Sequence, residues 1–365
     1  MTSCDEGTSA LIKLDDAVTL ALEEALDAHR TRSAPFVEIP LWDAYGHVLA
    51  EPVLADRDSP PFNRAAMDGF AFRADDLHLK CLEIIGEAPA GAPFSGRVTK
   101  GQAVAIMTGA PLPEGADTLA MIESCEVRDG RVHIEGQWPK GAHIARRGED
   151  IRAGDTAVPA GRAISGPTLG VLAGVGAENV RVHRPPRISV MATGNELVQL
   201  HATPAAHQIR ESNRHTLMAM LRGLRAAVVD GGIVSDDEDS LRDAIRSAEK
   251  SDIIVLSGGV SKGKYDLVKK VLLELGMRTV FHGVRAKPGK PVLFGRLGGS
   301  LVLGLPGNPV STYVMAVLLL LPMARTIAGL KQARTRRLSA RLSGRLPKTK
   351  GRTTYHPARL SESDI

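Results

Sequence analysis

The chain has 365 residues, which exceeds one ordinary domain, so we expect two to four domains. Hydrophobic residues make up 43% and aromatic residues only 4%, which argues against a protein that stacks nucleic-acid bases on aromatic side chains. The net charge of +5 comes from residues 331–365, where ten Lys or Arg stand against two acids; we interpret this stretch as a solvated basic tail rather than a nucleic-acid contact.

The three cysteines, Cys4, Cys81 and Cys125, lack metal-ligand spacing, and no charged-then-apolar secretory segment opens the chain. We therefore expect a cytoplasmic protein. The longest apolar run, Val314 to Leu321, is short for a membrane-spanning helix and is followed by Pro322, so we expect no membrane segment.

The first part of the chain favours helices. Residues 11–30 have an amphipathic pattern typical of a docking or dimer helix, and a short helical piece is expected around Trp42 to Leu49. Pro60 and Pro61 then indicate a domain boundary.

Residues 54–145 alternate short β-like runs with Gly and Pro turns, which predicts a small β domain. Two polar turns stand out in it, Ala66 to Phe70 and Thr108 to Asp117. Residues 146–182 are rich in Gly and Ala and read as a return segment with an apolar helix near Thr168 to Ala173, so we group them with residues 1–53. The expected strands of the β domain are Phe70 to Phe72, Leu82 to Ile85, Ala103 to Met107, Thr118 to Ile122 and Val132 to Glu135.

Residues 183–330 alternate strands with helices, which predicts a doubly wound α/β domain with a mostly parallel sheet. Its expected strands begin with Ile188 to Met191, Ala226 to Val229 and Ile253 to Leu256, and continue with Arg278 to Phe281, Pro291 to Phe294 and Leu301 to Leu303. Helices are expected after Ser212, around Leu241 to Ala248, from Asp266 and after Pro309.

Glycine-rich turns follow several of these strands, at Ser257 to Gly263 and at Gly304 to Pro309, and two lysines flank the Pro-Gly turn Lys287 to Pro291. The ends of parallel strands meet at one edge of a sheet, so these loops should gather there. Backbone N–H groups in glycine turns, a helix start and lysines favour a tetrahedral oxyanion. The sequence thus predicts an anion site.

Together these motifs resemble the molybdopterin molybdenumtransferase family, the MoeA type that includes the C-terminal domain of gephyrin. They occur in the family's order over most of the chain: Asp58 to Phe62 with Ala66 to Gly69, Thr108 to Ala110 with Pro113 to Asp117, Arg147 to Asp150, Thr193 to Leu197, Ser257 to Ser261, Lys287 to Pro291 and Gly304 to Ser311.

The resemblance implies a molybdopterin-binding fold for the doubly wound domain and a reaction in which adenylylated molybdopterin and molybdate give molybdenum cofactor and AMP, with Mg²⁺. It implies catalytic roles for Asp68, Thr108, Glu196 and Asp266. Substrate or molybdate binding is expected at Ser257, Gly258, Gly259, Ser261, Lys287, Lys290, Pro306, Gly307, Asn308, Pro309 and Ser311. Carboxylates suit Mg²⁺, and the candidates are Asp68, Glu196, Asp236 and Asp266.

Several of these residues have structural alternatives. Asp236 and Asp266 each precede a predicted helix, where either could be the N-cap. Asp68 and Thr108 sit in turns that such residues commonly stabilise, and Lys287 and Lys290 could be solvated surface lysines.

The resemblance also implies a homodimer with an active cleft shared between subunits, and as partners the molybdopterin adenylyltransferase and proteins that mature molybdoenzymes. Lys262 and Lys264 depart from the family's usual residues, and Gly283 stands where some members carry a lysine, which Arg285 would partly replace. Residues 331–365 read as an incomplete C-terminal β-barrel domain. This leaves two alternatives open: a catalytically weak dimeric scaffold of the same family, or a molybdopterin adenylyltransferase.

Overall fold

The computed structural model describes residues 11–259, 267–346 and 351–359. The chain divides into two compact units. Unit 1 comprises Met1–Glu51, Ala160–Leu169 and Asn179–Ile365, and unit 2 comprises Pro52–Pro159 and Gly170–Glu178. The domain boundaries expected from the sequence stay predictions.

A six-stranded sheet organises unit 1, in the order β16-β13-β17-β21-β20-β18. The first four strands are parallel neighbours, and β20 and β18 continue the sheet antiparallel. All five residues of β17 are buried, as expected for a strand covered on both faces. The strands are β13 (Arg187–Thr193), β16 (Ala227–Val234), β17 (Ile253–Ser257), β18 (Arg278–His282), β20 (Leu293–Leu297) and β21 (Ser300–Leu305).

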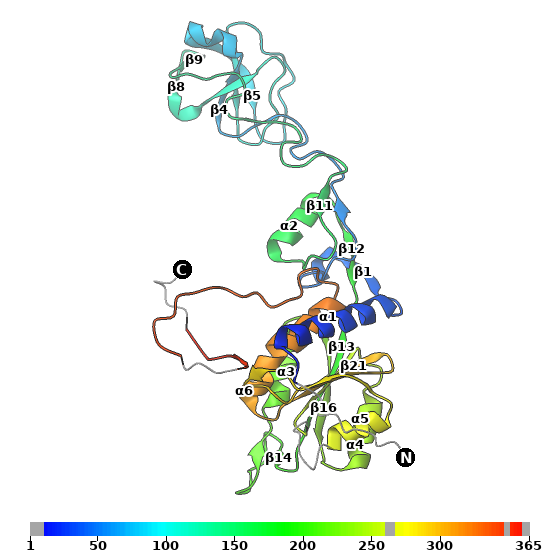
Figure 1. Ribbon diagram of the computed structural model, residues 1–365. Helices are drawn as coiled ribbons and strands as arrows, with labels where there is room; N and C mark the ends of the chain where they lie inside the picture. Colours follow the sequence, from blue (N-terminus) through cyan, green and yellow to red (C-terminus); the bar gives the residue numbers. More distant parts are fainter. Residues whose placement is uncertain (1–10, 260–266, 347–350, 360–365) are drawn as a thin grey trace. The chain divides into compact units, whose positions relative to one another are not determined.

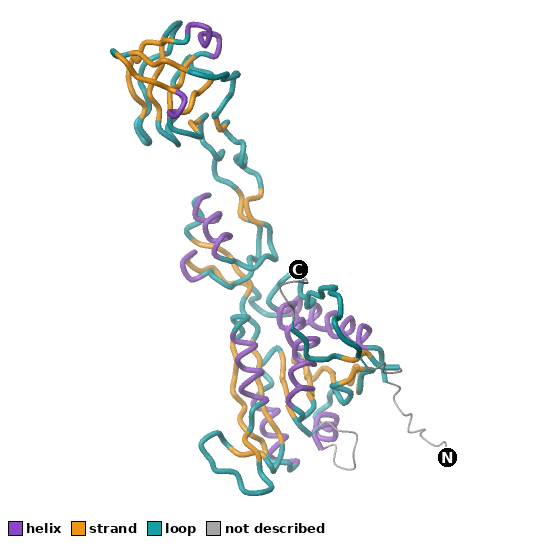
Figure 2. Tube along the Cα trace, turned by 90° about the vertical axis from the view of Figure 1, so that its left-hand side faces the viewer, coloured by secondary structure: helices purple, strands orange, loops and turns teal. Residues whose placement is uncertain are grey.

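Helices cover both faces of this sheet, which confirms the doubly wound fold (Figure 1). One core cluster joins the sheet to α1 (Leu14–Thr31), α3 (Asn213–Arg222), α6 (Pro309–Met315) and α7 (Leu321–Ile327). A second cluster joins the other face to α4 (Glu238–Ser247) and α5 (Leu267–Glu274). In Figure 2 these helices, in purple, flank the orange strands.

Pro322 lies inside the last helix rather than at its end. A π-helical segment, Ala316–Leu320, precedes α7, and the chain stays helical from Pro309 to Ile327. The wider π turn changes the hydrogen-bond pattern just before a residue that has no N–H to donate. This helix is long and apolar enough to cross a membrane, but 61% of its most apolar window is buried in the protein core.

The expected helix around Trp42 to Leu49 is also absent. The chain instead forms β1 (Phe36–Pro40), paired antiparallel with β12 (Asn179–His183), and then a short 3-10 turn, Leu41–Asp43. Trp42 is 89% exposed, so this stretch has no buried helical face there. The φ of +80° at Gly46 also interrupts any helical backbone. Two further strand pairs belong to unit 1: β14 (Leu197–Val198) with β15 (Ile209–Arg210), and β19 (Ala286–Lys287) with β22 (Thr353–Thr354).

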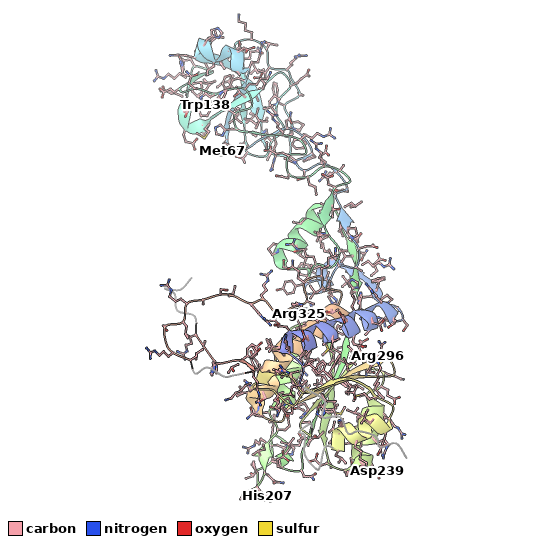
Figure 3. The ribbon with its side chains drawn as sticks, viewed as in Figure 1. Met67, Trp138, His207, Asp239, Arg296 and Arg325 are labelled. Carbon is pink, nitrogen blue, oxygen red and sulfur yellow. The ribbon has the colours of Figure 1, made fainter. Side chains whose placement is uncertain are left out.

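Unit 2 is built around a second six-stranded sheet, in the order β7-β4-β6-β5-β9-β8, which confirms the small β domain. Each β run expected there is a strand. Two core clusters cover its faces, and in one of them Trp138 donates its Nε1–H to the Glu135 carbonyl at 2.7 Å (Figure 3). The strands are β4 (Gly69–Phe72), β5 (Cys81–Ala88), β6 (Gln102–Ile106), β7 (Thr118–Met121), β8 (Cys125–Arg128) and β9 (Arg131–Ile134).

Shorter elements complete unit 2. Strand β2 (Val53–Leu54) pairs with β11 (Thr156–Val158), and β3 (Arg64–Ala65) pairs with β10 (Ile144–Ala145). Two 3-10 helices span Ala74–Leu79 and Ile122–Ser124. The expected apolar helix is α2 (Gly166–Gly174), whose residues are divided between the two units.

Candidate functional site

The carboxyl ends of the parallel strands in unit 1 enclose a pocket of about 410 Å³. The turns after β13, β17 and β21 all contribute to its lining, and so does Pro291 of the Lys287–Pro291 turn, so the described parts of the predicted loops do gather at this edge. The pocket lining includes, of the residues predicted to act, Glu196, Asp236, Ser257, Gly258, Gly259, Pro306, Gly307, Asn308, Pro309 and Ser311. Their roles stay predictions.

Two glycines allow the turn after β17 to pass close to its neighbours. Gly258 and Gly259 have φ of +101° and +65°, a region that glycine adopts without strain. A Cβ on Gly258 would lie 2.3 Å from the backbone oxygen of Thr193, so no side chain fits there. The Gly258 N–H donates to the Leu305 carbonyl at 3.0 Å, which holds the turn against the end of β21.

The pocket contains backbone donors that the described part of the chain does not use. No hydrogen bond within it engages the N–H groups of Gly259, Gly307 or Asn308. The N–H of Ser311 differs, because the Asn308 side chain accepts it at 3.2 Å as the N-cap of α6. Unengaged N–H groups from two glycine turns suit an oxyanion.

A buried hydroxyl lies behind these turns. Thr193 is 3% exposed, and its Oγ1 has no hydrogen-bond partner among the described residues. The same oxygen lies 2.8 Å from the position that a Cβ on Gly259 would take. The strand end and the glycine turn are therefore packed without room for a larger residue.

Glu196 and Asp236 bring two carboxylates to the pocket. Asp236 accepts the Asn195 N–H at 3.3 Å, and its own N–H donates to Asn195 Oδ1 at 3.2 Å, so the loops after β13 and β16 are joined. Loss of hydration raises the pKa of Asp236; the Asn195 N–H opposes this and the Glu196 carboxylate adds to it. The N-cap of α4 is Asp237, which accepts the Ser240 N–H at 2.8 Å, so the alternative that Asp236 is the cap is wrong.

These two carboxylates fit a magnesium ion that shares its coordination with a substrate. Their mutual repulsion is the kind that a cation relieves, and Mg²⁺ commonly takes one or two carboxylates plus phosphate oxygens and water. In the part of the chain that the structure describes, no three His, Cys, Asp or Glu residues form a ready-made metal site. Asp266 and Ser261, together with Lys262 and Lys264, lie outside the described residues.

The structure adds residues that the sequence reasoning missed. Asn213 donates from Nδ2 to Ser257 Oγ at 2.9 Å and to the Gly307 carbonyl at 2.7 Å, so one amide joins two of the pocket's turns. Glu211 also lines the pocket and is 2% exposed, and it pairs with Arg214 at 3.5 Å. The only sequence signal for Asn213 was its place at the start of a predicted helix.

Lys287 and Lys290 are exposed and are not among the residues that line this pocket. The backbone carbonyl of Lys287 accepts the Tyr355 N–H at 2.8 Å, within the pairing of β19 and β22. Arg285 donates its Nε–H to the Leu11 carbonyl at 2.9 Å and is likewise absent from the lining. The lysines expected to bind molybdate are thus not part of the pocket wall.

Asp68 and Thr108 meet each other in unit 2. The Asp68 carboxylate accepts the Thr108 N–H at 2.6 Å and its hydroxyl at 2.7 Å. Both hydrogen bonds lower the pKa of the exposed Asp68 carboxyl below its ordinary range, and the bond from the Thr108 hydroxyl has the larger effect. Thr108 also lies in a turn, which the Ala110 N–H closes by donating to the Met107 carbonyl. The structural alternative for Thr108, a position in a turn, is therefore present as well. The pair presents an ionised carboxylate held in a fixed position.

Two protein families match the chain in sequence. Residues 13–176 match the MoeA N-terminal region (domains I and II), and residues 189–326 match a probable molybdopterin binding domain. A molybdopterin molybdenumtransferase of Haemophilus influenzae is 34% identical over 325 residues, which cover 88% of this chain and 79% of the relative. Molybdopterin molybdenumtransferase 1 of Mycobacterium tuberculosis is 34% identical over 343 residues, covering 87% and 80%.

Solved structures of similar proteins agree with these matches. Two structures of a molybdopterin biosynthesis MoeA protein from Pyrococcus horikoshii superpose with TM-scores of 0.70 and 0.75, at 31% and 26% identity. They cover 88% and 89% of this chain, and the chain covers 81% of each of them.

Proposed function

Because the chain belongs to the molybdopterin molybdenumtransferase family, a family of transferases in molybdenum cofactor biosynthesis, we propose that it inserts molybdate into adenylylated molybdopterin with release of AMP. The observation that carries this proposal is the pocket in unit 1. It combines the unengaged N–H groups of Gly259, Gly307 and Asn308 with the two carboxylates of Glu196 and Asp236.

In the proposed reaction, the glycine-turn N–H groups donate hydrogen bonds to an oxyanion of the substrate, either molybdate or a phosphate. Asn213 maintains the spacing of the two turns, because its amide bonds to both. Glu196 and Asp236 would hold Mg²⁺, which supplies positive charge beside the phosphoanhydride when it is bound. Catalysis by this pocket is then mainly positioning and electrostatic stabilisation.

Asp68 and Thr108 have a separate part in the proposal. An ionised carboxylate with a lowered pKa suits contact with a cation or acceptance of a hydrogen bond from substrate. The family resemblance implies a homodimer whose subunits share the active cleft. We propose that this sharing lets the Asp68 and Thr108 turn of the β domain act on the substrate. The molybdopterin adenylyltransferase and molybdoenzyme maturation proteins are the proposed partners, in the cytoplasm.

The test is AMP release from adenylylated molybdopterin, with and without molybdate and Mg²⁺, by the chain and by its Asp68→Asn variant. We expect release that needs both molybdate and Mg²⁺ and falls in the variant. Binding of the substrate without release would favour a scaffold protein. Transfer of AMP from ATP to molybdopterin without molybdate would instead identify an adenylyltransferase.

A further inference from the structure

The opposite edge of the same sheet has a second cavity, of about 610 Å³. It lies at the amino ends of β13, β16 and β17, beside the last residues of α1, whereas the candidate site lies at the carboxyl ends of these strands. Strand β13 has seven residues, so the two cavities are separated by roughly 20 Å along the strands. The second cavity therefore does not belong to the candidate site.

One ion pair in this cavity is satisfied internally. The Arg32 side chain is 10% exposed, and its Nε and Nη2 bond to the two carboxylate oxygens of Asp252 at 3.1 and 3.2 Å. Asp252 Oδ2 also accepts the Arg187 backbone N–H at 2.7 Å. Asp252 is thus engaged by Arg32 and the backbone and cannot neutralise further cations in full.

Other cations in the lining lack such partners. Within the described chain, the side chains of Arg184, Arg187 and Lys250 make no hydrogen bond or ion pair. Arg225 donates to the Tyr45 carbonyl, at 3.1 Å from Nε and 3.0 Å from Nη2, which leaves its charge uncompensated. Among the described residues, Glu249 is the only other carboxylate of the lining. The cavity consequently has an excess of positive charge.

Helix dipoles explain only part of this excess. Lys250 follows the C-terminus of α4, where a cation is favoured by the helix dipole. Arg184 lies in the connection from β12 to β13, and Arg187 begins β13, so neither belongs to a helix. The helix dipole therefore favours a cation only at Lys250.

We propose that this cavity binds a small multivalent anion that carries phosphate groups. Guanidinium groups present paired N–H donors whose geometry matches phosphate oxygens, and Arg184 and Arg187 are uncommitted. The cations also lie close enough to act on one another: burial lowers the pKa of Arg32, Asp252 opposes the shift, and Arg184 adds to it. A bound anion removes this repulsion. The site is independent of the proposed transferase activity.

The test is calorimetric titration of the full chain with inorganic pyrophosphate. Because about tenfold in affinity corresponds to one strong charge-assisted contact, the Arg184→Gln/Arg187→Gln variant should bind about tenfold more weakly or worse. The single variant Lys250→Gln should weaken binding to a smaller extent. All three positions are exposed, so the thermal midpoint without ligand should be unchanged, which excludes loss of folding as the cause.

A matched control is the Arg97→Gln/Arg128→Gln variant, which removes the same charge from two exposed arginines of unit 2. It should bind pyrophosphate like the wild type. Equal affinity of the wild type and the Arg184→Gln/Arg187→Gln variant would overturn the proposal, since any binding would then occur elsewhere. An equal loss in the control variant would also overturn it, by showing a non-specific charge effect. Citrate binding as tight as pyrophosphate would refute the preference for phosphate.

Discussion

The pocket of unit 1 and the Asp68 turn of unit 2 present functional groups in different ways. In unit 1, segments far apart in the chain meet because parallel strands end at one edge. The pocket combines N–H groups, carboxylates and the Thr193 hydroxyl, which has no partner among the described residues. In unit 2, one exposed carboxylate is fixed by both donors of a single threonine. The pocket thus depends on the packing of a whole sheet, whereas the turn depends on one local contact.

The largest effect should come from filling the space at Gly258. In Gly258→Ala, the new Cβ meets the Thr193 carbonyl at 2.3 Å, so we expect a loss of roughly 3 kcal/mol or more in unfolding free energy, together with loss of substrate binding. The control is Gly276→Ala, which has φ of +92° with nothing within 4 Å of its Cβ. It should lose only about 1 kcal/mol and keep binding. Urea unfolding and substrate titration measure both, and equal losses would contradict the packing argument.

Asp68→Asn should leave the fold intact and reduce turnover by about 100-fold, since it removes a charge while keeping an oxygen for Thr108. Thr108→Val removes the hydroxyl donor and should reduce turnover less, whereas Thr108→Ser should be close to wild type. The rate of AMP release and the thermal midpoint separate activity from folding. If the thermal midpoint falls along with the rate of AMP release, the Asp68 turn has a structural role and not a catalytic one.

Acid should weaken unit 1 through His183. This ring is 9% exposed and lies 4.9 Å from His29 between ring centres, and burial lowers its pKa from 6.5 to about 4. The folded state thus favours the neutral ring. The contribution of His183 to the stability of the fold is complete above the pKa of the unfolded chain, and it is lost as the pH falls toward the pKa of the folded protein. We expect a loss of about 2 kcal/mol between about pH 7.5 and about pH 5.

Urea unfolding of the wild type and of His183→Phe at the two pH values measures this effect. The variant keeps a ring beside His29 but cannot be protonated, so its stability should change less with pH. The same pH dependence in both proteins would assign the acid sensitivity to other groups.

The smallest effects should separate two neighbouring aspartates. Asp237→Ala removes the N-cap of α4 and should lower the thermal midpoint by a few degrees without altering substrate affinity. Asp236→Asn should keep the midpoint and weaken Mg²⁺-dependent substrate binding, because Asp236 lines the pocket. Thermal unfolding and substrate titration distinguish the two variants. A lower midpoint in Asp236→Asn with weaker binding in Asp237→Ala would contradict both assignments.

Much of the architecture follows from local patterns. The apolar run Ile253 to Leu256 is a fully buried strand, as its length and β-branched residues indicate, and the helices around Leu217 and Leu241 show the expected spacing of buried residues. The stretch around Trp42 departs from the predicted helix, because Trp42 lies in an exposed 3-10 turn. There the lack of a buried face outweighed the local helical pattern.

Most strands of the two six-stranded sheets, the glycine turns after them and the ordered motifs of the family could be predicted from the sequence, because strand periodicity and the backbone freedom of glycine are properties of short segments. The further lining residues Asn213 and Glu211, in contrast, became visible only in the tertiary structure. The strand order β16-β13-β17-β21 is not the order of the chain, and it brings Asp236 beside Asn195 and Asn213 beside Ser257 and Gly307. It also leaves Lys287 and Lys290 off the pocket wall and gives the helix cap to Asp237. Such choices depend on distances between segments remote in sequence, which no local pattern encodes.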